Sequence, residues 1–139
     1  MAEAVGCALA EQGAVVVCGG LGGAMEAVCR GAKSAGGATV GILPGSDRSA
    51  ANDFVDLAVA TGLGEARNAV VVRTADAVIA VGGAYGTLSE IALALAAQKR
   101  VVGLNTWTLA RAEGPDEAIV RAASPQEAVE RALRTRSAG

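Results

Sequence analysis

The sequence predicts an α/β fold with three layers, in which a mostly parallel sheet is covered by helices on both faces. Short aliphatic runs alternate with segments whose apolar residues recur at helical spacing, as in successive βαβ units. Two of these runs end in glycine-rich turns that lead directly into helices. Hydrophobic residues make up 52% of the chain and aromatic residues only 2%, so the core is built from Val, Ala, Leu and Ile. Such a core is typical of parallel strands that are buried on both faces.

The first part of the chain predicts a helix, a strand and a second helix. We expect a helix over residues 2–12 that ends at Gly13, because its apolar residues share one face. The aliphatic run 14–18 is the first strand, and the glycine-rich turn 19–23 follows it at once. Helical spacing then continues until Gly36.

The middle of the chain adds two strands and a helix. Residues 38–43 form an aliphatic strand that a Pro-Gly pair closes, and a polar loop covers residues 46–53. Residues 55–59 are a weaker strand candidate, and a helix is expected over residues 63–74.

The clearest strand covers residues 75–81 and ends in the second glycine-rich turn, residues 82–87. A helix with apolar residues between 88 and 95 follows, and residues 100–104 form another strand.

The remainder is expected to contain a loop over residues 105–116 and a short strand at 119–120. Residues 124–127 open a last helix, with serine as N-cap, proline at the first position and glutamate closing a capping box. We therefore expect one domain over residues 1–139.

Composition excludes several classes of function. The formal net charge is −2 and no basic stripe is present, which disfavours nucleic-acid binding. A signal peptide and an apolar run of about 18 residues are absent, so a cytoplasmic protein without membrane contact is expected. The cysteines Cys7, Cys18 and Cys29 are widely spaced and histidine is absent, which disfavours a disulfide framework or a metal site. We interpret all three cysteines as small core residues.

The first glycine-rich turn is a candidate phosphate site. Glycine lets the backbone approach a ligand closely, and the start of the following helix offers unpaired N–H groups. A tight turn with close helix packing is the alternative, although four glycines in five residues exceed what one turn requires. The candidate ligand-binding residues are Gly19, Gly20, Gly22, Gly23 and the adjacent Met25.

The second turn repeats this pattern at another strand end, with Gly82, Gly83, Gly86 and Thr87 as candidate phosphate-binding residues. Thr87 and Glu90 also have the spacing of a capping box, which is the structural alternative. A carboxylate such as Glu90 beside a phosphate site can also contact a sugar hydroxyl or act as an acid–base group.

Arg67 and Asn68 are further ligand-binding candidates. A helical arginine is usually a surface residue, but Arg67 follows a glycine-flanked start and precedes the strand that leads to the second turn. Its guanidinium group matches the geometry of a phosphate. Asn52 and Asp53 are expected in a loop that borders the same crevice.

Six segments taken in order resemble the LOG-like Rossmann superfamily: residues 19–27, 30–32, 41–45, 61–62, 65–68 and 82–90. Within it, the chain is most similar to the branch of molybdenum cofactor carrier proteins. Older labels call such proteins lysine decarboxylases. The resemblance covers nearly the whole chain and implies a Rossmann-like fold.

The enzymes of that superfamily are phosphoribohydrolases, which cleave the base from a nucleoside 5′-monophosphate. By this resemblance Arg67 corresponds to the catalytic arginine and Glu90 to the catalytic glutamate. The chain departs from the enzyme signature at Val81, which replaces a proline, and at Asn68, which replaces a lysine. These departures fit the carrier-like branch better than the hydrolases.

A further departure concerns the start of the fold. The relatives open with a strand and a glycine turn before the first helix, whereas this sequence begins inside that helix. We therefore expect the sheet to lack the first strand of the family, and we expect the native amino terminus to include it. An intact mass would test this expectation.

Three functions stay open. The first is a binding protein for a phosphate-bearing nucleotide or a molybdenum-cofactor-like ligand, without any required cofactor. The second is a nucleoside-monophosphate phosphoribohydrolase, and the third is a structural relative that binds no ligand. A pyridoxal phosphate enzyme is not expected, because Lys33 and Lys99 are the only lysines and lie near helix ends away from the turns. A homo-dimer or tetramer is expected.

Overall fold

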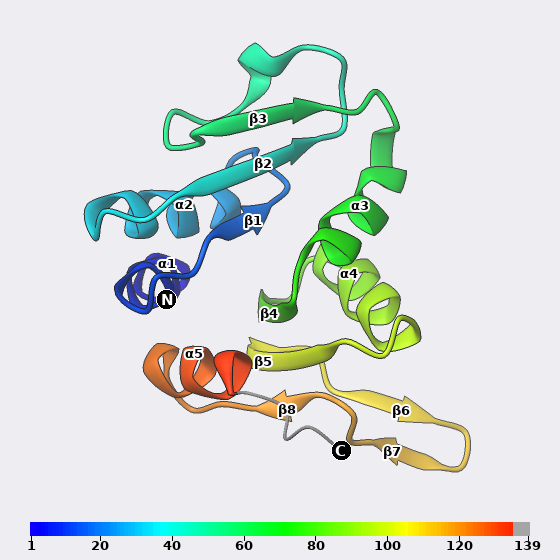
Figure 1. Ribbon diagram of the computed structural model, residues 1–139. Coiled ribbons are helices and arrows are strands. Elements are labelled where there is room, and N and C mark those ends of the chain that lie inside the picture. Colours follow the sequence, from blue (N-terminus) through cyan, green and yellow to red (C-terminus); the bar gives the residue numbers. More distant parts are fainter. Residues whose placement is uncertain (135–139) are drawn as a thin grey trace.

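The computed structural model describes residues 1–134 and has the predicted layered α/β architecture (Figure 1). Its helices are α1 (Ala2–Glu11), α2 (Ala24–Ser34), α3 (Arg67–Thr74), α4 (Tyr85–Ala96) and α5 (Pro125–Leu133). Its strands are β1 (Val16–Cys18), β2 (Thr39–Leu43), β3 (Leu57–Ala60), β4 (Ala77–Gly82), β5 (Arg100–Thr106), β6 (Leu109–Arg111), β7 (Gly114–Asp116) and β8 (Val120–Arg121). Short 3-10 turns lie at Arg48–Ala50 and Gly64–Ala66.

The parallel strands form two separate halves. One three-stranded sheet has the order β1-β2-β3 and the other has the order β4-β5-β8, and every pairing in both is parallel. β1 and β4 are the inner edges, and no strand among residues 1–134 pairs with the free side of either. As predicted, the described residues supply no strand ahead of α1, and the two halves do not pair with each other.

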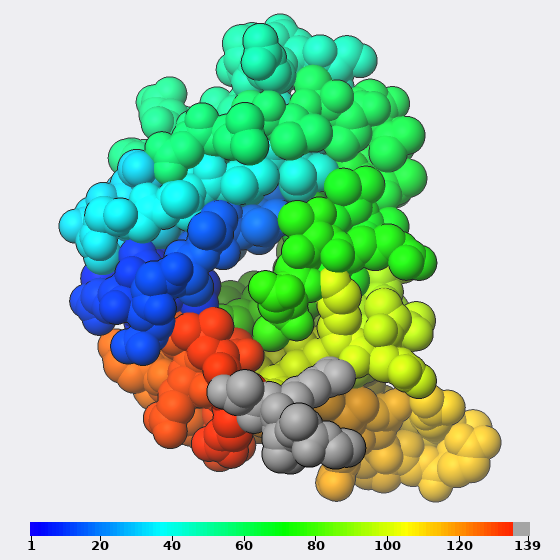
Figure 2. Space-filling view, viewed as in Figure 1, coloured from blue at the N-terminus to red at the C-terminus, as the bar shows by residue number. Residues whose placement is uncertain are grey.

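A cleft of about 870 Å³ separates β1 from β4. Figure 2 shows the molecule hollowed between the blue segment, which includes β1, and the green and red segments opposite. The walls are mostly aliphatic and come from β1, β4, α1 and the end of α5. The carboxyl ends of β1 and β4 face one end of this cleft, which is where open parallel sheets bind ligands.

Two apolar clusters hold the helices on the sheet. Val5, Val102, Leu104 and Val129 join α1 and α5 to β5, while a second cluster around Ile91 joins α3 and α4 to β4 and β5. Aliphatic side chains supply both clusters, as the composition predicts.

α1 and α2 pack with their backbones almost in contact. A Cβ atom added at Gly6 would lie 2.0 Å from the carbonyl oxygen of Val28, and one added at Gly31 would lie 1.9 Å from that of Glu3. Only glycine permits this approach. These two glycines therefore fix α2, and with it the first glycine-rich turn, against α1.

The prediction of a loop over residues 105–116 was wrong, because β6 and β7 form an antiparallel hairpin there. The strands have three residues each, too few for an alternating pattern to be recognised in the sequence. An ion pair of 3.1 Å between Nε of Arg111 and Oδ2 of Asp116 joins the two strands. Trp107 and Leu109 pack against the apolar cluster around Ile91.

The last helix begins as predicted. The Ser124 hydroxyl accepts a hydrogen bond from the Glu127 amide at 3.1 Å, and Pro125 occupies the first helical position. The Glu127 carboxylate accepts from the amide of Ala123, one residue earlier than the N-cap.

Residues 135–139 of the predicted domain lie outside the described part of the chain. No helix in the described part is long and apolar enough to span a membrane.

Candidate anion-binding site at the cleft

Residues from both glycine-rich turns line the same cleft. Gly19 and Met25 contribute from the first turn and α2, and Thr87 and Glu90 contribute from α4. The two turns, which are more than fifty residues apart in the sequence, therefore converge on one space as the sequence analysis required.

The first turn needs glycine for conformational reasons at two positions. Gly20 has a φ of 77° and Gly23 has a φ of 67°, values that side chains rarely allow. Asn52 holds the turn from the outside, because its side-chain amide donates to the carbonyl of Leu21 at 2.8 Å and to that of Gly20 at 3.3 Å. The backbone amide of Asn52 donates to Gly20 as well, at 2.9 Å. Neither Asn52 nor Asp53 lines the cleft, so the expectation that they border it was wrong. Asn52 instead positions the turn, and Asp53 is exposed.

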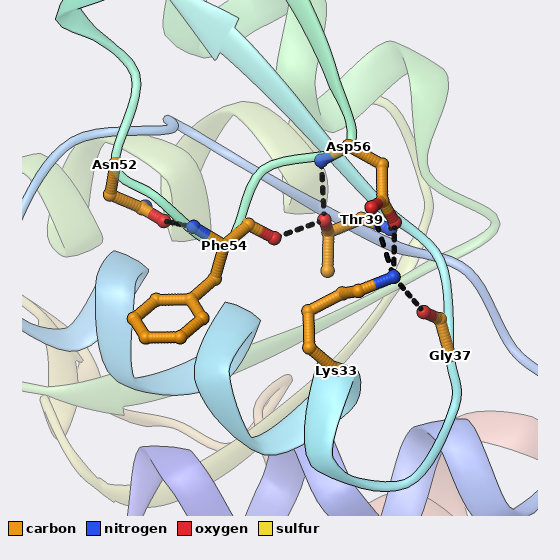
Figure 3. A network of polar contacts seen from close by, with 6 residues as sticks. All are labelled: Lys33, Gly37, Thr39, Asn52, Phe54 and Asp56. Atoms are coloured by element: carbon orange, nitrogen blue, oxygen red, sulfur yellow. Dashed lines mark hydrogen bonds and ion pairs between the residues drawn. The ribbon is translucent and has the colours of Figure 1, made fainter.

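A polar network anchors Asn52 to the rest of the sheet (Figure 3). Oδ1 of Asn52 accepts from the amide of Phe54 at 3.0 Å, and the carbonyl of Phe54 accepts from the Thr39 hydroxyl at 2.6 Å. The Thr39 hydroxyl in turn accepts from the amide of Asp56 at 2.8 Å. Lys33 pairs with the Asp56 carboxylate at 2.9 Å, which commits this lysine to a role away from the cleft. The network fixes the loop between β2 and β3, and through Asn52 the first turn.

The amides at the starts of α2 and α4 have no side-chain cap. Gly23 and Ala84 are the N-caps, and neither helix has a capping hydrogen bond from a described side chain. The first intrahelical bonds run from Ala27 to Gly23 and from Leu88 to Ala84, so the amides before these donors are unpaired within their helices. Atoms added at Gly22, Gly23, Gly83 or Gly86 would meet open space. Both helix starts can therefore be approached by an anion.

The alternative interpretation of Thr87 and Glu90 as a capping box was wrong. The helix begins at Tyr85, three residues earlier than that motif requires, because Ala84 already has the extended conformation of an N-cap. Thr87 consequently lies in the first turn of α4, Glu90 lies one turn further along, and both residues line the cleft. Both side chains are left free of a capping role.

Arg67 is the most unusual residue of the site. It is only 9% exposed, yet its guanidinium group makes no hydrogen bond or ion pair with any residue between 1 and 134. A Cβ atom added at Gly19 would lie 1.7 Å from Nη1 of Arg67 and 2.6 Å from Sδ of Met25. The guanidinium group thus lies directly on the backbone of the first turn, and Gly19 provides the space for it. Arg67 does not line the cleft itself, and its guanidinium nitrogens keep some access to solvent. Because they have no acceptor among residues 1–134, they are available to bind an anion beside the first turn.

Glu90 has the opposite charge and lies in the same neighbourhood. Burial raises the pKa of its carboxyl group, and the positive charge of Arg67 acts in the other direction. No hydrogen bond or ion pair joins Glu90 to another residue of the described chain. A partly buried carboxyl group with a raised pKa can accept from a ligand hydroxyl or act as an acid–base group.

The remaining predicted residues lie at the turns or behind them. Gly82 has a φ of 82° at the end of β4, and Gly83 and Gly86 flank the start of α4. Asn68 is buried next to Arg67 but does not line the cleft, and its side chain makes no hydrogen bond within residues 1–134. Across the same residues, no three His, Cys, Asp or Glu side chains are grouped to hold a metal ion.

Sequence reasoning missed three residues beside the turns. Cys18 accepts a hydrogen bond from the Gly20 amide at 3.4 Å. The interpretation of all three cysteines as core residues holds for Cys29 alone, because Cys7 and Cys18 are partly exposed. Tyr85 is 81% exposed and stacks obliquely with Trp107 at a centroid distance of 5.7 Å. The indole N–H of Trp107 donates to the carbonyl of Ala84 at 3.2 Å. A cysteine directly before one glycine run and a tyrosine inside the other were the available signals.

Comparisons with known proteins agree with this geometry. Residues 1–129 match the model of the SLOG cluster4 family. An uncharacterized protein from Archaeoglobus fulgidus is 48% identical over 123 residues, which cover 86% of this chain and 81% of that protein.

Two solved structures share the fold and considerable sequence. The molybdenum cofactor binding protein from Rippkaea orientalis is 39% identical, with a TM-score of 0.83 over 93% of this chain and 82% of that one. The molybdenum cofactor carrier protein from Chlamydomonas reinhardtii is 34% identical, with a TM-score of 0.79 over 94% of this chain and 83% of that one. The resemblance inferred from the motifs is thereby confirmed, and the chain belongs to the SLOG cluster4 family of LOG-like proteins.

Proposed function

We propose that this protein binds a phosphate-bearing small molecule, of the nucleotide or molybdenum-cofactor class, at the end of the cleft between β1 and β4. The observation that carries the proposal is Arg67, a residue only 9% exposed whose guanidinium group has no acceptor among residues 1–134, keeps some access to solvent and lies on the first glycine-rich turn beside the cleft. A group of this kind is stabilised by an anion that can accept from it.

Each part of the site has a place in this proposal. The guanidinium group of Arg67 would hold the phosphate through paired N–H donors, and the amides at the starts of α2 and α4 would add further donors. The Thr87 hydroxyl supplies another donor on the cleft wall. Glu90 would accept from a hydroxyl of the ligand rather than from the phosphate, because two negative charges repel each other.

The relatives narrow the ligand class. Two structural relatives are described as proteins that bind or carry the molybdenum cofactor. In such a protein the cofactor is cargo, and the site requires affinity without turnover. Asn68 and Val81, where the hydrolase signature has lysine and proline, favour this binding role over catalysis.

Calorimetric titration of the protein with AMP, GMP and molybdenum cofactor tests the proposal. We expect at least one of these ligands to bind, and Arg67→Ala to weaken that binding by about 10- to 100-fold, the range for loss of charge-assisted hydrogen bonds. Arg73→Ala is the matched control, since Arg73 is an exposed arginine on the same helix. Absence of binding by all three ligands, or equal affinity in both variants, would overturn the proposal and favour a structural role.

Glu90 favours a second candidate function, the hydrolysis of a nucleoside 5′-monophosphate to base and ribose 5-phosphate. A partly buried carboxyl group with a raised pKa, close to a phosphate-binding arginine, can stabilise positive charge that develops on the ribose. The test is release of free adenine from AMP by the wild type, Glu90→Gln and Arg67→Ala proteins. Release by the wild type alone would establish hydrolysis, and equal background release by all three would exclude it.

A further inference from the structure

Two cysteine sulfurs lie next to each other behind the first glycine-rich turn. Sγ of Cys18 and Sγ of Cys29 are 3.5 Å apart, which is hydrogen-bonding distance for thiols. Cys18 is the last residue of β1 and lines the cleft, while Cys29 is on α2 and is completely buried. Cys7 is elsewhere, on α1, where its thiol donates to the Glu11 carboxylate.

The two thiols have unequal surroundings. The hydrogen bond from Cys29, together with the one from the Gly20 amide, lowers the pKa of the Cys18 thiol against the effect of burial. The same contact and burial raise the pKa of the Cys29 thiol far above its usual range. Cys18 lines the cleft and accepts from the Gly20 amide, so we expect it to be the sulfur that reacts first, with the buried Cys29 as its partner. Arg67 adds a favourable positive charge for the Cys18 thiolate, which the nearby Glu90 opposes.

We propose that Cys18 and Cys29 form a reversible redox pair, which a hydroperoxide oxidises to an intramolecular disulfide. In the first step the Cys18 thiolate attacks the peroxide oxygen, the O–O bond breaks, and Cys18 becomes a sulfenic acid while hydroxide or an alkoxide leaves. In the second step the Cys29 sulfur, on losing its proton, attacks the Cys18 sulfur and displaces water, which closes the S–S bond. Two thiols are oxidised and one peroxide is reduced. The cleft gives the peroxide access to Cys18, and no access to Cys29 is needed.

Disulfide formation would alter the first glycine-rich turn. The bond joins the end of β1 to the second turn of α2, so the segment that it closes contains the whole turn and the start of the helix. The distance between the two sulfurs shortens from 3.5 Å to about 2.05 Å when the bond forms. The Cys18 sulfur, which accepts from the Gly20 amide, then moves or becomes a weaker acceptor. The next expectation rests on the proposed function. The oxidised protein should bind AMP, or whichever ligand the titration identifies, about tenfold more weakly, which is the effect of losing one good hydrogen bond.

Thiol counting on the full chain tests the redox pair without any ligand. The reduced protein is treated with hydrogen peroxide, the remaining thiols are alkylated, and intact mass and peptide mapping follow. We expect one alkylated thiol, Cys7, a loss of two hydrogen atoms, a peptide that joins Cys18 to Cys29, and recovery of three thiols with dithiothreitol. Three alkylated thiols after treatment, or oxidation of Cys7 before the pair, would overturn the proposal.

Variants separate the roles of the two sulfurs. Cys7→Ser is the matched control and should form the disulfide as the wild type does. Cys29→Ala should stop at oxygen adducts of Cys18, and Cys18→Ala should show no oxidation of Cys29 because that sulfur is buried. If Cys29→Ala fails to fold, the wild-type peptide map still decides the matter. If the disulfide forms but ligand affinity stays unchanged, only the proposed effect of oxidation on ligand binding is overturned. If the reduced protein binds no ligand, the result counts against the proposed function and not against the redox pair.

Discussion

At the scale of single residues, the site depends on the absence of a side chain at position 19. The Arg67 guanidinium group occupies the space where a Cβ atom of residue 19 would lie, and that group is the flexible end of a long side chain. The Gly19→Ala variant should therefore keep its stability within about 1 kcal/mol but displace Arg67, because the guanidinium group moves more easily than the backbone.

Calorimetric titration and thermal melting of Gly19→Ala check this prediction together. We expect ligand affinity to fall by about tenfold or more while Tm changes little. Gly45→Ala is the control, since a Cβ atom there would meet open space and would not displace the guanidinium group. A large loss of Tm with unchanged affinity would show that Gly19 serves packing instead.

The ionisation of Glu90 gives a second prediction at this scale. Burial raises the pKa of its carboxyl group in the folded protein, and Arg67 limits this rise. Removing the guanidinium group in Arg67→Ala should raise that pKa further, because the carboxylate loses a favourable charge. Carbon-detected NMR of the glutamate carboxyl groups over a pH titration measures it, and an unchanged or lower value in the variant would contradict the prediction.

The raised pKa of Glu90 also determines how the free energy of unfolding depends on pH. A carboxyl group whose pKa is raised on folding destabilises the folded state above that pKa, and the penalty disappears as pH falls below the unfolded value of about 4.3. The Glu90→Gln variant should therefore have a higher Tm than the wild type at neutral pH, and the difference should vanish in acid. Melting curves over this pH range decide it, with Glu130→Gln, an exposed glutamate, as control.

At the scale of elements, the close crossing of α1 and α2 decides where the first turn lies. An alanine at position 31 would place a methyl group 1.9 Å from the carbonyl of Glu3, a clash with backbone that cannot move without separating the helices. We expect Gly31→Ala to lower the free energy of unfolding by about 2 kcal/mol, as overpacking does.

A second glycine provides the matched control for that experiment. Gly86 is also within a helix, but a Cβ atom there would meet open space, so Gly86→Ala should be neutral or stabilising by up to about 1 kcal/mol through helix propensity. Urea unfolding of both variants measures the difference. Equal destabilisation would mean that the crossing is not what makes glycine necessary at position 31.

Elements whose own sequence determines them could be predicted, and elements that depend on remote contacts could not. The aliphatic runs within β2, β4 and β5 were identified because a buried parallel strand has a nearly continuous run of apolar residues. The hairpin of β6 and β7 was missed because Arg111 and Asp116 pair only after the chain has turned. The start of α4 was placed too late because Ala84 has no side chain that marks an N-cap.

The site shows the same division. The glycines and Arg67 could be predicted as phosphate-binding candidates because glycine turns before helices and arginine side chains suit phosphate whatever surrounds them. The role of Asn52 as a clamp on Gly20 and Leu21, and the contact between Cys18 and Cys29, depend on segments that meet only in the folded chain. No local pattern in the sequence predicts these contacts between distant segments.

At the scale of the whole molecule, the divided sheet is the dominant feature. β3 presents Leu57 and Val59 to solvent at the outer edge of one half, with exposed fractions of 58% and 38%. Self-association as a dimer or tetramer stays a prediction, which light scattering on the purified protein measures. The inner edges of β1 and β4 matter more for the site, because the two turns that converge on the ligand belong to different halves.

The dimensions of the cleft suggest what would join the two halves. With strands about 4.8 Å apart, a rise of about 3.3 Å per residue and layers about 10 Å apart, one strand residue fills roughly 160 Å³. The cleft of about 870 Å³ therefore has room for about five residues in extended conformation. A strand parallel to both neighbours would end near the beginning of α1, because α1 leads into β1 through a short connection and so runs opposite to it.

We therefore predict that an engineered extension of five β-branched residues and a glycine-containing turn, joined ahead of Met1, raises Tm by about 10 °C. Such a strand would bury aliphatic side chains against Val17 and Val78 and would pair the free edges of β1 and β4, which joins the halves that carry the two turns. The control extension has the same length with aspartate and serine at the buried positions, which cannot be accommodated between apolar walls. Melting curves of the two fusions compare them directly, and a rise in Tm that is equal for both sequences would show that the cleft does not accept a strand.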